Sequence, residues 1–69
     1  MTQLREAMTI TFYHDGGGVA KFTPAIQGHV WYDTYFNGVS IFHSTLKVED
    51  VAGVMMDIMN KGYYLPCDS

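Results

Sequence analysis

An Asn-Gly pair near the middle of the chain constrains the fold more than any other feature. Asn37-Gly38 separates two runs rich in β-branched and aromatic residues, residues 29–36 and 39–44. Because Asn-Gly favours a two-residue turn with positive φ angles, this pattern predicts an antiparallel β-hairpin. The turn also sets which residues of the two strands lie opposite each other, and this register sorts the side chains onto two faces.

Counting outward from the turn gives two faces of different chemistry. One face comprises Val30, Tyr32, Thr34, Phe36, Val39, Ile41 and His43. The other comprises His29, Trp31, Asp33, Tyr35, Ser40, Phe42 and Ser44. We expect the first face to form the core, because it has four purely apolar side chains and no acidic one. The second face alternates aromatic with polar side chains, which suits a surface in contact with water or a partner.

Two further strands are predicted before the hairpin. Residues 8–13 alternate between apolar and threonine or tyrosine side chains, which is the period of a half-buried strand. Residues 19–23 resume this pattern with Ala20 and Phe22 on the inner side, and Pro24 ends the strand because it cannot donate to a ladder.

After Thr45 the spacing of the apolar residues changes to that of an amphipathic helix. The predicted apolar stripe comprises Val48, Val51, Ala52, Met55, Ile58 and Met59. Ser44 or Thr45 is the candidate N-terminal cap, and Gly62 marks the expected end. The sequence therefore predicts an α+β fold of β-β-β-β-α order, an antiparallel sheet of about four strands with the helix packed on one face. Residues 1–69 are expected to form a single compact domain, with 1–7 as a frayed extension or short helical turn.

Composition and charge exclude several functional classes. Apolar residues make up 48% of the chain and charged residues only 16%, which is typical of a folded domain. The net charge of −3 disfavours nonspecific binding to nucleic acid phosphates. Residues 29–44 also contain no Lys or Arg, whereas sheets that stack single-stranded bases have basic rims. We therefore expect no direct nucleic acid partner.

Catalytic and metal-binding patterns are weak in this sequence. The glycine run after His14-Asp15 has neither the spacing of a phosphate-binding loop nor the Lys-Ser/Thr pair that follows one. The histidines His14, His29 and His43 are not spaced as metal ligands, and Cys67 is the only cysteine, so no internal disulfide is expected. We expect no enzymatic activity, cofactor or metal, no membrane partner, and a cytoplasmic location.

A single helix covers one face of a sheet, so the other face should stay at least partly exposed. That face would present Trp31, Tyr35 and Phe42, joined by Tyr13. Three interpretations remain open: a second small core covered by the N-terminal residues or the Tyr63-Tyr64-Leu65 tail, a surface for a partner, or a surface for self-association. The outer side of the helix, with Glu49, Gly53 and Met56, is a second candidate contact patch.

In size and composition the chain resembles small accessory proteins of phages and mobile elements, such as anti-CRISPR proteins and phage inhibitors of host RNA polymerase. This resemblance implies a non-enzymatic inhibitor or regulator of a larger host protein complex in the host cytoplasm. Acidic side chains would steer it to a basic, nucleic-acid-binding groove; these are Asp33, Glu49, Asp50 and Asp57. The expected protein-binding residues are Trp31, Asp33, Tyr35, Phe42, Tyr13, Glu49, Gly53 and Met56. The alternative is a homo-oligomeric structural or regulatory module that assembles through the aromatic face or an edge strand.

Overall fold

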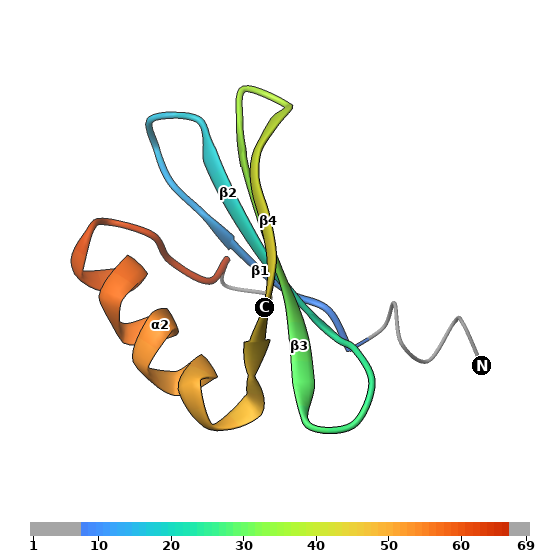
Figure 1. Ribbon diagram of the computed structural model, residues 1–69. Helices are drawn as coiled ribbons and strands as arrows, with labels where there is room; N and C mark the ends of the chain where they lie inside the picture. Colours follow the sequence, from blue (N-terminus) through green and yellow to red (C-terminus); the bar gives the residue numbers. More distant parts are fainter. Residues whose placement is uncertain (1–7, 67–69) are drawn as a thin grey trace.

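The computed structural model describes residues 8–66 and contains a four-stranded antiparallel sheet followed by one helix (Figure 1). The elements are β1 (Ile10–Tyr13), β2 (Gly18–Pro24), β3 (His29–Phe36), β4 (Val39–Lys47) and α2 (Val48–Asn60). The strands lie in the order β1-β2-β3-β4, so each strand pairs with its neighbour in the sequence. The α+β fold predicted from the sequence is thus confirmed.

The turn between β3 and β4 has the predicted geometry. Asn37 and Gly38 have φ angles of 51° and 83°, and Phe36 lies opposite Val39. Glycine and asparagine tolerate positive φ better than other residues, so this pair closes the hairpin at low cost.

A β-bulge in β4 overturns the predicted register beyond the second residue pair. Tyr35 lies opposite Ser40, but Thr34 lies opposite Phe42, so Ile41 is an extra, unpaired residue. The remainder of β4 therefore faces the opposite way from the prediction. Phe42, predicted on the aromatic and polar face, lies on the helix side, and His43, predicted on the core face, lies on the other.

The bulge has a physical rationale. It places Leu46 opposite Val30, and both side chains pack against the core. It also leaves the His43 ring largely in water, where its polar nitrogens cost nothing to solvate. Without the extra residue, the imidazole would face the helix and the leucine would face solvent.

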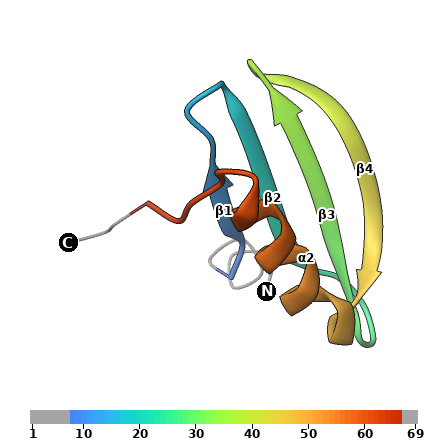
Figure 2. The ribbon, with the colours of Figure 1, turned by 90° about the vertical axis from the view of Figure 1, so that its left-hand side faces the viewer.

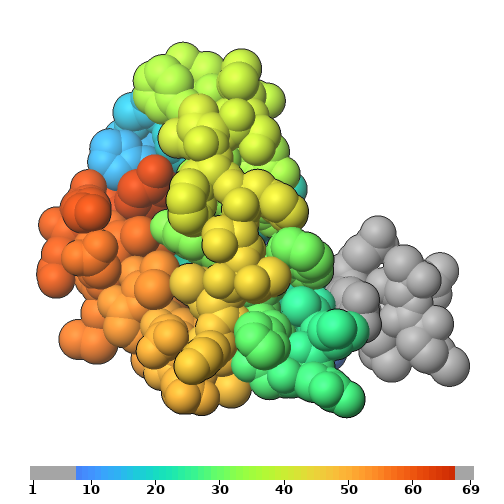
Figure 3. Space-filling model, viewed as in Figure 1, coloured from blue at the N-terminus to red at the C-terminus, as the bar shows by residue number. Residues whose placement is uncertain are grey.

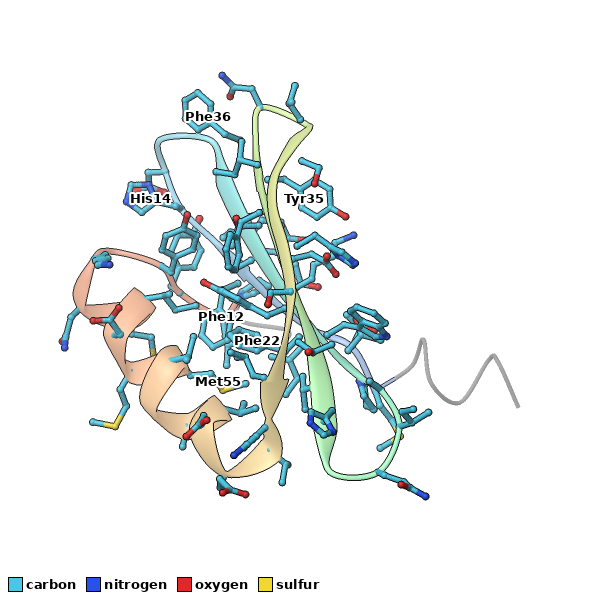
Figure 4. The ribbon with its side chains drawn as sticks, in the orientation of Figure 1. Phe12, His14, Phe22, Tyr35, Phe36 and Met55 are labelled. Atoms are coloured by element: carbon cyan, nitrogen blue, oxygen red, sulfur yellow. The ribbon has the colours of Figure 1, made fainter. Side chains whose placement is uncertain are left out.

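The centre of the core comes from β1, β2 and α2 rather than from the hairpin. Phe12, Ala20, Phe22 and Ile58 are buried to 5% exposure or less. The rings of Phe12 and Phe22 meet edge to face with centroids 5.7 Å apart, and Figure 4 shows both rings between the sheet and the helix. The prediction that the hairpin supplies the core is therefore only partly correct, because its inner side chains pack around this centre. These surrounding hairpin residues are Val30, Tyr32 and Leu46.

The helix faces the sheet with a slightly different stripe from the predicted one. Its inward side chains are Val51, Val54, Met55 and Ile58. Val48, Ala52 and Met59, which were expected in the stripe, are exposed. β4 continues as far as Lys47, so Lys47 precedes the helix and the predicted caps Ser44 and Thr45 lie within the strand.

The helix ends as predicted at Gly62. This glycine has a φ of 103°, and its N–H donates to the carbonyl of Met59 while the Tyr63 N–H donates to that of Ile58. This pair of bonds is the Schellman arrangement, which satisfies carbonyls that have no partner within the helix.

The helix covers only part of the sheet. A helix of 13 residues is about 20 Å long, whereas the nine residues of β4 extend about 30 Å. Figure 2 shows α2 across the lower part of the sheet, and the tip of the hairpin projects beyond it in Figure 3. Phe36, Val39 and Ile41 at this tip are 51–63% exposed, although their face was predicted to be core.

Candidate functional site

The face of the sheet turned away from α2, which we call the open face, is formed by alternate residues of all four strands. Successive side chains of a strand point to opposite faces, and the buried side chains of Phe12, Ala20 and Phe22 identify the covered one. The register then assigns to the open face Thr11, Tyr13, Val19, Lys21, Thr23, Trp31, Asp33, Tyr35, Ser40, His43 and Thr45. Figure 4 shows Tyr35 on the side of the sheet away from the helix.

Trp31 is held in place by its neighbours on this face. The indole stacks on the His43 ring with centroids 4.8 Å apart and planes at 14°. The Nδ1 atom of His43 is hydrogen bonded to a carboxylate oxygen of Asp33, its partner across the β3–β4 ladder. Trp31 nevertheless remains 38% exposed, so an aromatic surface of fixed orientation is available to a partner.

A hollow of about 360 Å³ lies on the open face near the hairpin turn. Its lining residues are Tyr13, Val19, Lys21, Tyr35 and Gly38. The Lys21 ammonium lies 5.5 Å from the centroid of the Tyr35 ring, within the range of a cation–π interaction. The open face thus combines two tyrosines, a tryptophan and a positive charge.

Tyr64 extends the open face beyond β1. It pairs with Tyr13 through two backbone hydrogen bonds of 2.8 and 2.9 Å, so the two side chains share a face. Its hydroxyl donates to Asp15 over 3.3 Å, and the negative charge of that carboxylate raises the pKa of Tyr64 above its ordinary value. The sequence left two alternatives for residues 63–65, which were to pack back as a cover or to add a short edge strand. This part of the tail adds to the edge of the sheet. The other expected cover, residues 1–7, lies outside the described residues.

The structure divides the predicted protein-binding residues into separate surfaces. Tyr13, Trp31, Asp33 and Tyr35 lie together on the open face. Phe42 lies on the helix side, where its ring meets that of Tyr32 edge to face with centroids 5.8 Å apart. The helix residues form a third group, exposed on the opposite side of the sheet from Trp31; they are Glu49, Gly53 and Met56. The expected acidic contact set is divided in the same way, because Asp33 alone of its members lies on the open face.

Lys21 is the functional candidate that sequence analysis missed. The absence of Lys and Arg was noted for residues 29–44, which form the hairpin, whereas Lys21 belongs to β2. The signal was available, because an inward Phe22 requires its neighbour Lys21 to point outward. The sequence pattern alone did not show that β2 lies beside β3, and this pairing brings Lys21 next to Tyr35.

The groups that an enzymatic site would have required are not brought together. His14 accepts a hydrogen bond from the Gly16 N–H at Nδ1 and donates from Nε2 to the Lys61 carbonyl, joining the β1–β2 loop to the end of α2. His29 is the first residue of β3, roughly 23 Å along the strand from Phe36 at its other end. Phe36 lies opposite Gly18, next to the loop that carries His14. The side chains of His14 and Asp15 therefore do not meet that of His29 in a common pocket.

Residues 8–66 contain neither a candidate metal site nor a helix that could cross a membrane. In this range no three of the His, Cys, Asp and Glu side chains are grouped so that they could hold a metal ion. The one helix of the same range is too short and insufficiently apolar to cross a membrane. Cys67 lies outside the described residues.

Compared with protein-family models, curated proteins and solved structures, the chain shows no significant match.

Proposed function

We propose that this chain is a non-enzymatic protein-binding module that inhibits or regulates a larger protein complex. This is the role expected of a small accessory protein. The open face is the proposed contact surface. The observation that carries the proposal is the exposure of Trp31 and Tyr13, 38% and 41%, on one face with Tyr35. Aromatic side chains of this size normally contribute to a core, and here the helix covers the other face.

The arrangement of these side chains favours binding. Tryptophan and tyrosine dominate binding energy at interfaces, because they bury a large area and lose little conformational entropy. The stack on His43 restrains the indole, and Lys21 lies over the Tyr35 ring. Side chains that are already restrained in the free protein lose less entropy on association.

The proposal is tested by comparing two double variants of the immobilised protein. The first double variant, Trp31→Ala with Tyr35→Ala, removes the aromatic side chains of the open face. The second, Glu49→Ala with Met56→Ala, truncates two side chains on the exposed side of α2. We expect proteins from an extract of the native host cells, quantified by mass spectrometry, to be retained by the wild type and the helix variant. The face variant should lose at least tenfold of this retention while its circular dichroism spectrum stays unchanged. Retention by a folded face variant, with loss by the helix variant, would place the interface on α2 instead.

A second candidate function, assembly into a homo-oligomer, is favoured by the edge of the sheet at β4. Among residues 8–66 this strand has no pairing partner on its outer side, and it contains no Asp, Glu, Lys or Arg from Val39 to Leu46. Such uncharged edges readily pair with another strand. Size-exclusion chromatography with light scattering distinguishes the candidates. A concentration-dependent dimer that Ile41→Lys abolishes would support edge pairing, and a monomer at all concentrations would exclude it.

A further inference from the structure

Lys21 and Asp33 lie directly opposite each other on the open face but do not form an ion pair. The β2–β3 register makes them cross-strand partners, and opposite charges in such positions normally attract. Instead, the Asp33 carboxylate is bonded to His43 on the next strand. The Lys21 ammonium lies over the Tyr35 ring. Within residues 8–66, no carboxylate oxygen lies within 4.0 Å of it.

This positive charge stands at the wall of the hollow described above. The volume of about 360 Å³ lies in the range of sites that hold small ligands, about 300–1,000 Å³. Tyr13 and Tyr35 supply hydroxyl groups that can donate hydrogen bonds, and Val19 supplies an apolar wall. Gly38 has no side chain to close the end of the hollow near the turn.

The chemistry of these groups matches a carboxylate at the end of a short aliphatic chain. An ammonium and two phenolic hydroxyls are donors for its two oxygens, and hydrogen bonds between charged groups are stronger than neutral ones. The aliphatic part would lie against Val19 and the tyrosine rings. A nucleic acid fits less well, because the face has Asp33 beside Lys21 and the chain carries a net charge of −3, which repels a polyanion.

We propose that the hollow beside Lys21 receives an aspartate or glutamate side chain of the partner protein. The inference rests on the proposed function and adds the chemistry of the partner, which presents a single acidic side chain to the open face. Because the Asp33 carboxylate is hydrogen bonded to His43, it does not pair with Lys21, and the lysine ammonium can bind the carboxylate of the partner.

The test is an NMR titration of the isotope-labelled full chain with three short peptides. Ac-Ala-Glu-Ala-NH₂ carries a side-chain carboxylate, and Ac-Ala-Gln-Ala-NH₂ differs from it only by an uncharged amide. Ac-Ala-Gln-Ala-OH carries its carboxylate at the C-terminus. We expect the glutamate peptide to bind with a Kd on the order of 10 mM, as one charged contact allows. The shifts should be centred on Tyr13, Lys21 and Tyr35, and the glutamine amide should bind at least tenfold more weakly.

Two lysine variants complete the experiment. Lys21→Met keeps the length of the side chain and removes the charge, so the glutamate peptide should bind it at least tenfold more weakly than the wild type. Lys61→Met is the matched control, because Lys61 lies at the end of α2 beside Asp57. It should bind the peptide as the wild type does.

Four results would overturn the inference. These are equal binding of the glutamate and glutamine amides, no detectable binding of either, unchanged binding by Lys21→Met, and tighter binding of the C-terminal carboxylate than of the glutamate side chain. Binding of a short oligothymidine to the same residues, more tightly than the glutamate peptide, would also overturn it in favour of a nucleic acid.

The outcome is separable from that of the proposed function. If the Trp31→Ala/Tyr35→Ala variant loses its partners while the peptides fail to bind, the open face is an interface but not one for an acidic side chain. If the peptides bind while that variant keeps its partners, the hollow binds carboxylates and the proposed interface is wrong.

Discussion

Both faces of this sheet carry aromatic rings, but the rings at the centre of the covered face are buried and those of the open face are partly exposed. On the covered face, Phe12 and Phe22 are 1% and 2% exposed and contact each other and the helix. On the open face, Tyr13 and Trp31 are about 40% exposed and contact polar neighbours. Phenylalanine has no polar atom, whereas tyrosine and tryptophan have a hydrogen-bonding group at one end. Phe36 and Phe42 lie on the same face as the core and are nevertheless 51% and 52% exposed. Contact with the helix and with the central core side chains, rather than the type of ring, therefore decides which rings are buried.

Polar groups have opposite roles on the two faces. The centre of the covered face, at Phe12, Ala20 and Phe22, is buried with side chains that need no hydrogen-bond partner. The open face uses charged and polar groups to orient its rings, as His43 does for Trp31 and Lys21 for Tyr35. Folding stability should therefore depend on the first face and binding on the second.

The sharpest test of this contrast compares Phe22→Ala with Trp31→Ala. Phe22 is at the centre of the core, so its truncation should lower the free energy of unfolding by about 3–5 kcal/mol. Trp31 is partly solvated, so its truncation should cost about 1 kcal/mol, the size of a cross-strand and propensity effect. Urea denaturation followed by circular dichroism measures both values.

Phe22→Leu keeps this comparison measurable if the alanine variant does not fold, because a domain of this size has a total stability of only about 3–10 kcal/mol. A loss of about 3 kcal/mol or more from Trp31→Ala, the size expected for a buried aromatic side chain, would mean that the open face is a second core rather than a binding surface.

A smaller effect of opposite sign is expected at Gly53 on the exposed side of α2. A Cβ atom at this position would meet nothing within 4 Å, so the glycine has no packing role within residues 8–66. Gly53→Ala should raise the free energy of unfolding by about 0.5–1 kcal/mol, because alanine restricts the unfolded chain and favours the helix. Thermal unfolding should show a Tm higher by about 2–8 °C. A lower Tm would mean that this side of the helix packs against another part of the protein or a second copy, which would weaken the distinction between the open face and α2.

The smallest effect concerns the covered face at alkaline pH. Burial of Tyr32 beside Phe22 and Phe42, with the nearby charges of Tyr63 and Asp57, raises its pKa above the ordinary value near 10. The folded state therefore holds this proton more tightly than the unfolded state does. The resulting stability is fully present below about pH 10 and is lost as the pH rises through the higher pKa of the folded state.

Tyr32→Phe should flatten this alkaline decrease. Urea unfolding of both proteins between about pH 9 and 11 measures it, and the absorbance of the phenolate reports the titration. The same decrease in both proteins would assign it to another group.

Much of the architecture followed from local patterns in the sequence. The Asn37-Gly38 turn, the inward positions of Ala20 and Phe22 and the end of the helix at Gly62 were all predicted correctly. Each depends on interactions within a few residues: the φ preference of a turn, the alternation of a strand, or the cap of a helix. Such features are largely independent of the rest of the fold.

The predictions that the structure contradicts concern features that depend on contacts between segments far apart in the sequence. The bulge at Ile41 responds to packing of Leu46 near Val30 and the helix, and no short-range signal marks it. It reversed the assignments of Phe42 and His43. The length of the helix relative to the hairpin left Phe36, Val39 and Ile41 exposed at the tip.

The candidate site shows the same division. Its aromatic members Tyr13, Trp31 and Tyr35 could be predicted, because alternation within each strand determines the face of a side chain. The sequence by itself thus determined that aromatic rings occupy both faces of a four-stranded sheet that has one helix to cover it. Only the tertiary structure decided that Lys21 stands beside Tyr35 while its cross-strand partner Asp33 turns to His43. Pairing between strands sets these neighbours, and it depends on the register and on the packing of the whole sheet rather than on any one segment.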